Sequence, residues 1–168
     1  IISRAGEYVK SGGGKAFVIT DSNVAPHYLG SVVKSLEGAG LTVRPVTLPA
    51  GEKTKSFNTL PMLYSLALEA GLTRSDVVVT LGGGVIGDLG GFMAATYMRG
   101  VKFVQIPTSL LAQVDSSVGG KVGVDLPEGK NLVGAFHQPA CVLIDPDTLS
   151  TLPAHFIADG MGAAIKYG

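Results

Sequence analysis

Short apolar runs alternate with amphipathic stretches along most of this chain. Each run is rich in valine, isoleucine and other strand-forming side chains, and residues that favour turns bound it. Continuous apolar runs of this kind are typical of strands that are buried on both faces of a parallel sheet. We expect strands at Lys15–Thr20, Thr42–Leu48, Val77–Leu81, Val101–Ile106 and Ala140–Asp145.

The stretches between these runs carry the pattern of helices. We expect helices over Val24–Glu37, Ser56–Ala70 and Asp88–Met98, of which the last is almost uncharged and therefore buried. A short helical turn precedes the sequence SGGG near the start, and a further helix follows Pro153. This alternation of strands and helices predicts an α/β fold with a mainly parallel, Rossmann-like sheet and right-handed crossovers.

The segment Val77–Asp88 joins a predicted strand to a predicted helix through three consecutive glycines. Gly82, Gly84 and Gly87 satisfy the pattern G-x-G-x-x-G. In that pattern glycine lets the backbone turn sharply and approach a ligand, and the helix N-terminus favours a phosphate. The alternative is that the glycines only permit tight packing of strand and helix. The ordinary dinucleotide fold also has an acidic residue about 20 positions further on, and Val101–Ile106 and its flank contain none.

Other polar side chains stand where predicted strands end. Asp21 follows the first strand, and Thr108 and Ser109 follow the fourth. Ligands of open α/β sheets bind at these carboxyl ends, so Asp21 could hold a ribose hydroxyl, although capping of the next helix explains it equally well. The polar turn that contains Lys53 and Lys55 could contact phosphates or hydroxyls, or could be only a solvated loop.

From Leu110 onward the apolar pattern gives way to polar residues among glycines and serines. The side chains capable of chemistry in this stretch are Asp115, Lys121, Asp125, Lys130, Asn131 and His137. Packing does not explain such a density of polar groups. The segment is no Walker loop, because Lys121 is not followed by Ser or Thr and Asp115 occupies the place of the first required glycine. His137 receives no assignment.

Composition narrows the expected partners and compartment. The 168 residues are 46% hydrophobic and 15% charged and include 24 glycines, which indicates a globular α/β protein, most simply one domain, with two small domains as the alternative. Thirteen basic and thirteen acidic side chains give no net charge, so we expect neither nucleic acid nor an anionic membrane as a partner. There is no apolar run of the roughly 20 residues that span a bilayer, and no apolar signal region at the start. The single cysteine, Cys141, suits a reducing compartment, so we expect a cytoplasmic protein.

Four segments carry a resemblance to a known family: GGGVIGD, GFMAATYMRG, IPTSLLAQVDSSVGGKVGVDLPEGKNLVGAF and GMGAAIKYG. Through them nearly the whole chain resembles the 3-dehydroquinate synthase family of the sugar-phosphate cyclase superfamily. The resemblance implies an N-terminal NAD-binding α/β domain and a C-terminal helical domain, with a divalent metal, usually zinc, in the active site between them. We therefore expect residues 1–152 to form the NAD-binding domain, with a substrate-lining segment at 110–139. Residues 153–168 would begin the helical domain, whose remainder is absent.

The resemblance also implies a lyase reaction of the shikimate pathway, in aromatic amino acid biosynthesis. The enzyme would convert 3-deoxy-D-arabino-heptulosonate 7-phosphate to 3-dehydroquinate and phosphate. NAD would oxidise a substrate hydroxyl, phosphate would leave by β-elimination, NADH would reduce the ketone, and an aldol step would close the ring. The chain alone is expected to be inactive.

Motif matches imply the site residues. Substrate contacts would come from Asp115, Lys121, Lys130, Asn131 and Lys166, with Arg99 reaching substrate phosphate across a homodimer interface. Cofactor contacts would come from Asp21, Asn23, Glu52, Lys55, Gly83, Gly84, Asp88, Thr108, Ser109 and Thr151. Ala163 stands where the family has a metal-ligating glutamate, so we expect no metal ligand from this chain and poor zinc binding. Asp159, four residues earlier, is an inferior substitute because it lies at a different height on the helix.

Three other functions stay open. The chain could be a sister cyclase that acts on another sugar phosphate, or an NAD-linked glycerol-phosphate or polyol dehydrogenase. The segment GKNLVGAF favours 3-dehydroquinate synthase over both. It could also be a non-catalytic nucleotide-binding module, because half of a catalytic site is missing.

Overall fold

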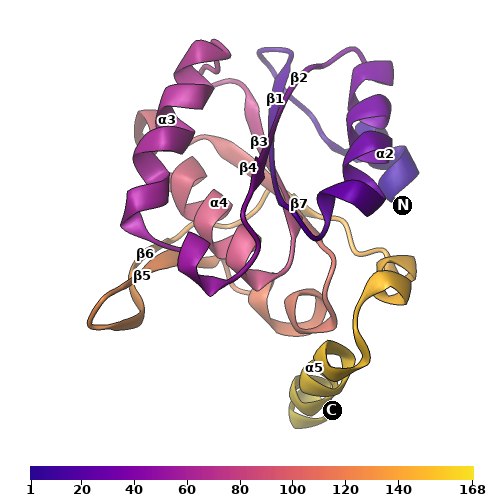
Figure 1. The fold of residues 1–168 in the computed structure, drawn as a ribbon. Helices are drawn as coiled ribbons and strands as arrows, with labels where there is room; N and C mark the ends of the chain where they lie inside the picture. Colours follow the sequence, from indigo (N-terminus) through magenta and orange to yellow (C-terminus); the bar gives the residue numbers. More distant parts are fainter.

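A five-stranded parallel sheet forms the centre of the computed structural model, which describes residues 1–168 (Figure 1). The strands lie in the order β2-β1-β3-β4-β7 and comprise β1 (Lys15–Asp21), β2 (Thr42–Leu48), β3 (Val77–Gly82), β4 (Lys102–Pro107) and β7 (Cys141–Val142). The helices are α1 (Ala5–Tyr8), α2 (Ala25–Gly38), α3 (Leu60–Glu69), α4 (Gly84–Thr96) and α5 (Ala154–Tyr167). A separate antiparallel hairpin pairs β5 (Lys121–Leu126) with β6 (Gly129–Phe136). Short 3-10 turns occupy Ile2–Arg4, Glu52–Thr54, Phe57–Thr59, Tyr97–Arg99 and Pro146–Thr151, and Ala112–Ser116 forms a π-helical turn. The prediction of an α/β fold with a mainly parallel sheet is confirmed.

Helices cover both faces of the sheet, with α1 and α2 on one face and α3 and α4 on the other (Figure 1). Side chains alternate along each strand, so Phe17 and Ile19 of β1 belong to the core under α3 and α4, and Val18 to the core under α2. All six residues of β3 are buried, as its apolar run predicts. Cys141 is half-buried and packs against the core under α2.

The strand order reverses between β1 and β3. After β1 the chain moves to one side to form β2, and then returns past β1 to form β3 on the other side. Thr20 pairs with Leu81, so Asp21 and Gly82 leave the sheet side by side at its carboxyl edge. Open α/β sheets bind ligands at such a switch point, and the chain places both of its predicted ligand-binding turns there.

The bounds of α4 differ from those predicted. The helix begins at Gly84, four residues before the predicted Asp88, because the glycine turn is itself helical from that residue. It ends at Thr96, and Met98 and Arg99 then adopt left-handed φ angles of 49° and 64°. The helix that covers the middle of the sheet therefore starts directly at the end of β3.

Two other elements are shorter than predicted. The helix expected from Ser56 begins as a 3-10 turn and becomes α-helical at Leu60, which places Pro61 in the first turn, where its missing N–H costs no hydrogen bond. A strand is expected over Ala140–Asp145, but only β7 (Cys141–Val142) pairs with β4.

The apolar pattern does not predict the β5–β6 hairpin, because glycines interrupt both strands and weaken the strand signal. In the structure Val122 and Val124 join the core that α4 helps to form. Gly91 of α4 permits this packing, since a Cβ there would collide with the Val122 side chain. The polar segment from Leu110 onward is therefore built against α4.

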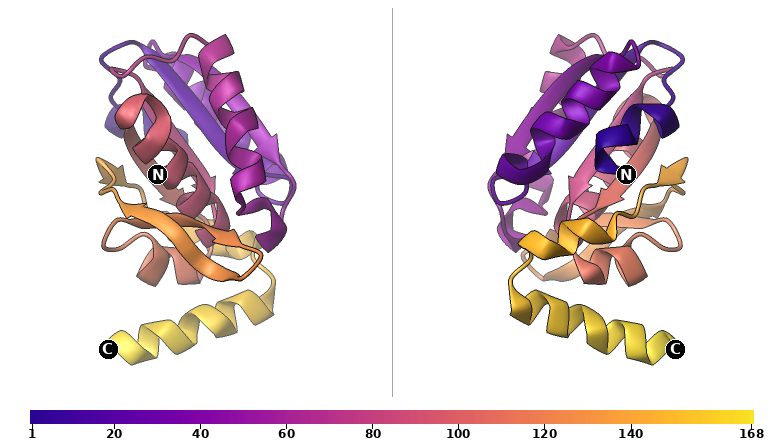
Figure 2. Two further views of the ribbon diagram at one scale, coloured as in Figure 1. Left: turned by 90° about the vertical axis from the view of Figure 1, so that its left-hand side faces the viewer. Right: turned by 90° about the vertical axis from the view of Figure 1, so that its right-hand side faces the viewer.

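Helix α5 stands apart from the sheet and from the other helices (Figure 2). It packs on the π-helical turn and on the residues just before it, where a Cβ on Gly160 would lie 2.7 Å from Leu110 Cβ. Most of its side chains are exposed. No helix of the structure, α5 included, has the length and apolar character needed to cross a membrane. The division of the chain between residues 152 and 153 stays a prediction.

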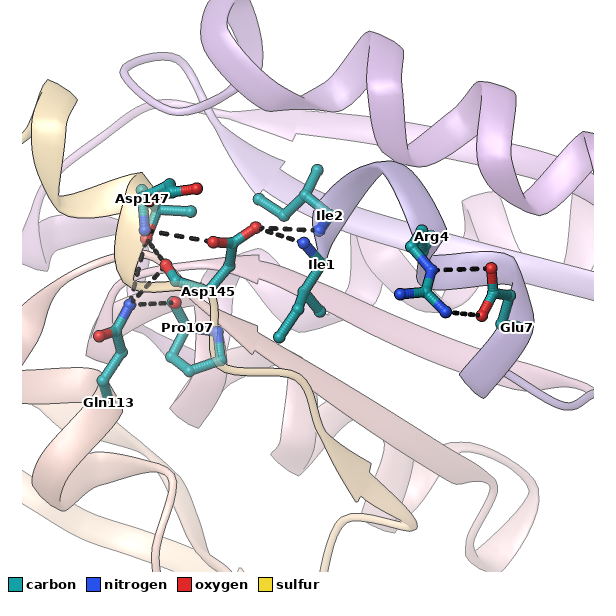
Figure 3. Close-up of polar contacts among 9 residues, drawn as sticks. Ile1, Ile2, Arg4, Glu7, Pro107, Gln113, Asp145 and Asp147 are labelled. Atoms are coloured by element: carbon teal, nitrogen blue, oxygen red, sulfur yellow. Dashed lines mark hydrogen bonds and ion pairs between the residues drawn. The ribbon is translucent and has the colours of Figure 1, made fainter.

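A buried amide joins two loops at the carboxyl edge of the sheet (Figure 3). Gln113 Nε2 donates to Pro107 O (3.2 Å), to Thr148 Oγ1 (3.1 Å) and to Asp145 O (3.3 Å). Asp145 in turn accepts the backbone N–H of Ile2 at 3.1 Å. The segments that follow β4 and β7 are thereby held in a fixed relation to each other.

A single carboxylate organises the opposite, amino edge. Asp76 is fully buried and accepts hydrogen bonds from Thr73 N (2.7 Å), Thr73 Oγ1 (2.9 Å), Lys15 N (2.9 Å) and Ser11 Oγ (3.1 Å). Burial alone would raise the pKa of Asp76, but these hydrogen bonds outweigh it and hold the pKa below its usual value. Asp76 is therefore an ionised, fully satisfied carboxylate that ties the start of β1 to the start of β3.

Candidate functional site

The glycine turn between β3 and α4 lies at the carboxyl edge. None of Gly82, Gly83 and Gly84 has a positive φ, so the turn from β3 into α4 uses no backbone conformation that is restricted to glycine. Close approach requires them instead: a Cβ on Gly82 would lie 2.9 Å from Ile86 Cβ, and one on Gly84 would lie 3.0 Å from Ser116 Oγ. No side chain caps α4 at Gly83. The exposed N–H groups of the first helical turn therefore favour an anion at this position.

Asp21 ends β1 beside the glycine turn. Its Oδ1 accepts the backbone N–H groups of Asn23 (2.8 Å) and Val24 (3.0 Å). The N-cap of α2 is Val24 and no side chain caps that helix, so Asp21 holds the preceding turn and does not cap the helix as the alternative interpretation expects. The other oxygen of Asp21 takes part in no hydrogen bond within the chain, and the adjacent Thr20 hydroxyl is buried without a partner. One carboxylate oxygen is therefore free, and the contact to a ribose stays a prediction.

The ammonium group of Lys55 lies at the centre of a second polar cluster, and its side chain is only 6% exposed. Lys55 Nζ lies 2.8 Å from Asn131 Oδ1, 3.2 Å from Glu52 Oε1, 3.3 Å from Asp88 Oδ2 and 3.7 Å from Asp125 Oδ1. We call these five residues the Lys55 cluster. It joins the turn after β2 to α4 and to the hairpin, and it brings together four residues to which the motifs assign cofactor or substrate contacts.

Burial and neighbouring charges shift the pKa values of the Lys55 cluster in opposite directions. Burial would lower the pKa of Lys55, but the carboxylates of Asp88 and Glu52 outweigh it and hold the pKa above its usual value. For Asp88 burial dominates and raises the pKa, although the charge of Lys55 opposes it. Lys55 is therefore an ammonium ion at neutral pH, and the Asp88 carboxyl takes up a proton more readily than an ordinary aspartate does.

An open pocket of about 430 Å³ lies between α4 and the hairpin. Asp88, Asp115, Lys121 and Asn131 line it with polar groups, and Phe136 forms an apolar wall. Lys121 and the Asn131 amide nitrogen offer donors that no group of the chain occupies, and the two carboxylates offer acceptors. Convergent polar groups in a pocket of this size suit a small polar ligand. The structure thus brings three predicted substrate residues and one predicted cofactor residue into one cavity.

Other predicted cofactor residues lie along the same edge. Thr108 is buried, and its N–H donates to the carbonyl of the last β3 residue at 3.0 Å. Ser109 faces the glycine turn, since a Cβ on Gly83 would lie 3.4 Å from Ser109 Oγ. Thr151 Oγ1 is 2.6 Å from Tyr28 Oη, on the side of the sheet that α2 covers.

Three predicted substrate residues do not reach the pocket within this chain. Lys130 is 73% exposed, and its Nζ lies 3.8 Å from Glu52 Oε1. Lys166 lies on α5, 5.6 Å from the centre of the Tyr167 ring. Arg99 is exposed at the far end of α4, at the amino edge of the sheet. A role for Arg99 in this pocket therefore needs a second copy of the chain.

The side chains of this chain do not by themselves fit a metal ion. No group of three or more His, Cys, Asp or Glu residues is arranged to hold one. Ala163 is half-buried on α5 and has no donor atom, and Asp159 is exposed. A dinucleotide fits the carboxyl edge better, because the uncapped start of α4, the free oxygen of Asp21 and the unpartnered hydroxyl of Thr20 are all found there.

Two residues of this edge have no assignment from the sequence. Asp125 stands within the polar segment, but its contact with Asn131 could not be predicted, because the hairpin that brings the two residues together leaves no clear pattern in the sequence. Gln113 is the only polar residue in the apolar stretch LLAQV. That position could have indicated a buried side chain that forms hydrogen bonds.

An open parallel sheet with a glycine turn and a polar pocket at its carboxyl edge defines a Rossmann-like α/β protein. Residues 45–159 match the family model described as 3-dehydroquinate synthase N-terminal. The chain belongs to the 3-dehydroquinate synthase family.

One relative is the 3-dehydroquinate synthase of Clostridium botulinum (strain Alaska E43 / Type E3). It is 61% identical to this chain over 156 residues, which cover 93% of this chain and 45% of the relative. The chain therefore spans a little under half the length of the curated relatives it matches.

Solved structures share the fold. The crystal structure of 2-deoxy-scyllo-inosose synthase in complex with carbaglucose-6-phosphate, NAD+ and Co2+ superposes with a TM-score of 0.88 at 29% identity, over 96% of this chain and 45% of that one. Glycerol dehydrogenase from Schizosaccharomyces pombe superposes with a TM-score of 0.79 at 23% identity, over 98% of this chain and 40% of that one, which shows a common fold alone.

Proposed function

We propose that this chain is the NAD-binding half of a 3-dehydroquinate synthase of the shikimate pathway. The complete enzyme would convert 3-deoxy-D-arabino-heptulosonate 7-phosphate to 3-dehydroquinate and phosphate. The observation that carries the proposal is the pocket between α4 and the hairpin, where Asp88, Asp115, Lys121 and Asn131 converge in a chain of this family. The 61% identity to a synthase, against 29% to a sister cyclase, supports this substrate over others.

NAD would bind along the carboxyl edge, across the switch point. The first N–H groups of α4 at Gly83 and Gly84 would donate to its pyrophosphate, and the free oxygen of Asp21 would accept a ribose hydroxyl. Bound NAD would supply a hydride acceptor for a substrate carbon and return the hydride later, so that no net NADH forms. The structure of 2-deoxy-scyllo-inosose synthase, which shares this fold, contains NAD+ and supports NAD as the cofactor.

Lys121 and Asn131 suit an anionic substrate rich in oxygen atoms. The ammonium of Lys121 would offset negative charge on the phosphate or on an oxygen where charge develops, and the Asn131 amide would donate to a hydroxyl. Asp115 would accept a hydrogen bond from another hydroxyl of the substrate. These fixed groups orient the sugar phosphate and stabilise charge without moving.

A homodimer in the cytoplasm would complete the site. Arg99 does not line the pocket of its own chain and is exposed beyond the C-terminal end of α4. We propose that Arg99 binds the phosphate held in the pocket of a partner subunit.

The divalent metal of the reaction would need ligands from beyond this chain. Ala163 would contribute none, so a complete enzyme that carries it would bind zinc poorly and turn over slowly. The experiment must therefore include the variant Ala163→Glu.

The test is a chimera in which this chain replaces the matching part of the Clostridium botulinum relative, with Ala163 and as Ala163→Glu. We expect the Ala163→Glu chimera to release phosphate from the heptulosonate phosphate without net NADH and to hold more zinc than the Ala163 chimera. Adding Lys121→Ala should lower the rate by about 100-fold.

Two results would refute the proposal. One is steady NADH production with a polyol. The other is the absence of phosphate release from an Ala163→Glu chimera that is folded and binds NAD. Equal zinc content and equal rates in the two chimeras would show that Ala163 does not limit the metal site.

A further inference from the structure

Asp125 lies at an irregularity in the β5–β6 hairpin. Val124 pairs with Val133, but the next pair is Leu126 with Gly129, so three residues of β6 lie opposite Asp125 alone. A bulge of this kind redirects side chains and is common beside functional sites. The middle residue of the three is Asn131, which lines the pocket.

The bulge holds Asn131 in a conformation that few residues adopt. Its φ is 56°, in the left-handed region, which asparagine tolerates better than most residues. Asp125 Oδ1 accepts the backbone N–H of Asn131 at 2.8 Å, and Lys55 Nζ donates to the Asn131 side-chain oxygen at 2.8 Å. Main chain and side chain of Asn131 are thus both fixed, and the amide nitrogen is left as the free donor.

Asp125 also attaches the hairpin to the segment that carries Lys55. Its backbone N–H donates to Lys55 O at 3.0 Å, and its carboxylate lies 3.7 Å from Lys55 Nζ. Burial would raise the pKa of Asp125, but the N–H of Asn131 and the nearby charges outweigh it and lower the pKa. The carboxylate is therefore ionised at neutral pH and is a constant acceptor for Asn131.

We propose that Asp125 is a positioning residue of the pocket: it fixes Asn131 in the bulge so that the Asn131 amide N–H groups bind an oxygen of the sugar phosphate. Asp125 does not itself line the pocket, so it acts through Asn131 rather than on the substrate. The inference rests on the proposed function for the identity of the ligand. The hydrogen bond that it invokes belongs to the chain alone and can be tested without turnover.

The experiment compares two substitutions of Asp125. Asp125→Ala removes both the acceptor and the charge, whereas Asp125→Asn keeps an oxygen that can accept the Asn131 N–H. Glu128→Ala is the matched control, because Glu128 is an exposed acid at the tip of the same hairpin and forms no side-chain hydrogen bond or ion pair. Hydrogen exchange of the Asn131 backbone amide is measured in the chain, and kcat and KM for the sugar phosphate are measured in the Ala163→Glu chimera.

We expect Asp125→Ala to speed exchange at Asn131 about tenfold and to raise KM by about the same factor, with a smaller change in kcat. Asp125→Asn should retain most of the exchange protection and most of the affinity, and Glu128→Ala should resemble the parent. Unchanged exchange in Asp125→Ala would overturn the proposal, as would equal KM in that variant and the parent chimera. If the parent chimera releases no phosphate, the proposed function fails, and the exchange result alone decides whether Asp125 positions Asn131.

Discussion

The two edges of the parallel sheet differ in how fully their polar groups are paired. At the amino edge Asp76 accepts four hydrogen bonds and has no exposed surface. At the carboxyl edge the hydroxyls of Thr20 and Ser117 are buried without partners, and Asp21 has a free oxygen. Buried polar groups without partners are costly. The difference indicates that Asp76 stabilises the fold at the amino edge, whereas these unpaired groups at the carboxyl edge are kept available for a ligand.

The pKa values of two aspartates, one at each edge, are shifted in opposite directions. At Asp76 hydrogen bonds to the carboxylate outweigh burial and lower the pKa, whereas at Asp88 burial outweighs the charge of Lys55 and raises it. The same residue type is thus held ionised where it supports the chain and made easier to protonate where it faces the pocket. Substitutions at the two edges should separate stability from binding.

The largest effect is expected for Asp76→Ala. Four donors would lose their acceptor in a buried site, so the free energy of unfolding should fall by about 3 kcal/mol or more. Urea unfolding at pH 7 measures this, with Glu69→Ala, an exposed acid at the end of α3, as the control. A loss no larger than in the control would show that the amino edge does not depend on this carboxylate.

Asp21→Ala should act mainly on binding. Loss of one or two charge-assisted hydrogen bonds to the ribose should weaken NAD by roughly 1.5–3 kcal/mol, measured by calorimetric titration. Asp21→Asn is the matched variant, because it keeps an oxygen that can accept the N–H groups of Asn23 and Val24 while it removes the charge. It should retain stability and lose part of the affinity. An unchanged dissociation constant in Asp21→Ala would show that Asp21 only holds the turn before α2.

Acid should affect the buried Asp76 and the half-buried Asp88 in opposite directions. Asp76 has a lowered native pKa, so its contribution to stability is present above the pKa of the unfolded chain and is lost as pH falls through the native value. Asp88 has a raised native pKa, so the native state gains stability relative to the unfolded chain as pH falls through that value. Unfolding of Asp76→Asn and Asp88→Asn between pH 7 and about 2, a range that includes the pKa of an unfolded aspartate at about 3.9, should show opposite trends relative to the parent. Parallel trends would contradict the contrast between the edges.

The smallest effect is expected for Thr20→Val. This change replaces an unpartnered buried hydroxyl by a methyl group of similar size, so stability should stay the same or rise by up to about 1 kcal/mol. Thr80→Val is the matched control, because the Thr80 hydroxyl donates to Val104 O at 3.5 Å. Thermal unfolding compares the two variants. A clear loss in Thr20→Val would mean that its hydroxyl is satisfied after all.

The apolar runs predict the parallel sheet well because burial on both faces leaves a strong signal in the sequence. Val77–Leu81 is an example, since it is predicted as a buried strand and becomes the fully buried β3. The hairpin leaves a weaker signal, because glycines such as Gly123 and Gly134 interrupt both strands between the inward-facing residues. The two glycines are there because the backbones of the two strands approach too closely for a Cβ at either position.

The site could be predicted only where a motif or a strand end marks it. Asp21 and the glycine turn follow from the order of strands, whereas the Lys55 cluster depends on tertiary packing between distant segments. Asp125 shows the limit: its role depends on the bulge that brings it to Asn131, and no local pattern encodes that bulge. The conformation of the glycine turn could not be predicted from the sequence either, because the same glycines are compatible with a sharp turn and with close packing.

The Lys55 cluster also bears on the order in which this chain folds. Lys55 and Asn131 are separated by 76 residues, and their hydrogen bond closes a loop that contains β3, α4 and β4. Contacts of such long range form slowly, because the entropy of loop closure is lost before the contact is gained. The hydrogen bond from Asn131 to Asp125 lies within the hairpin, but the contact with Lys55 forms only when the hairpin has docked beside α4. We therefore expect the pocket to be the last part of the molecule to reach its native geometry during refolding, after the sheet has already formed.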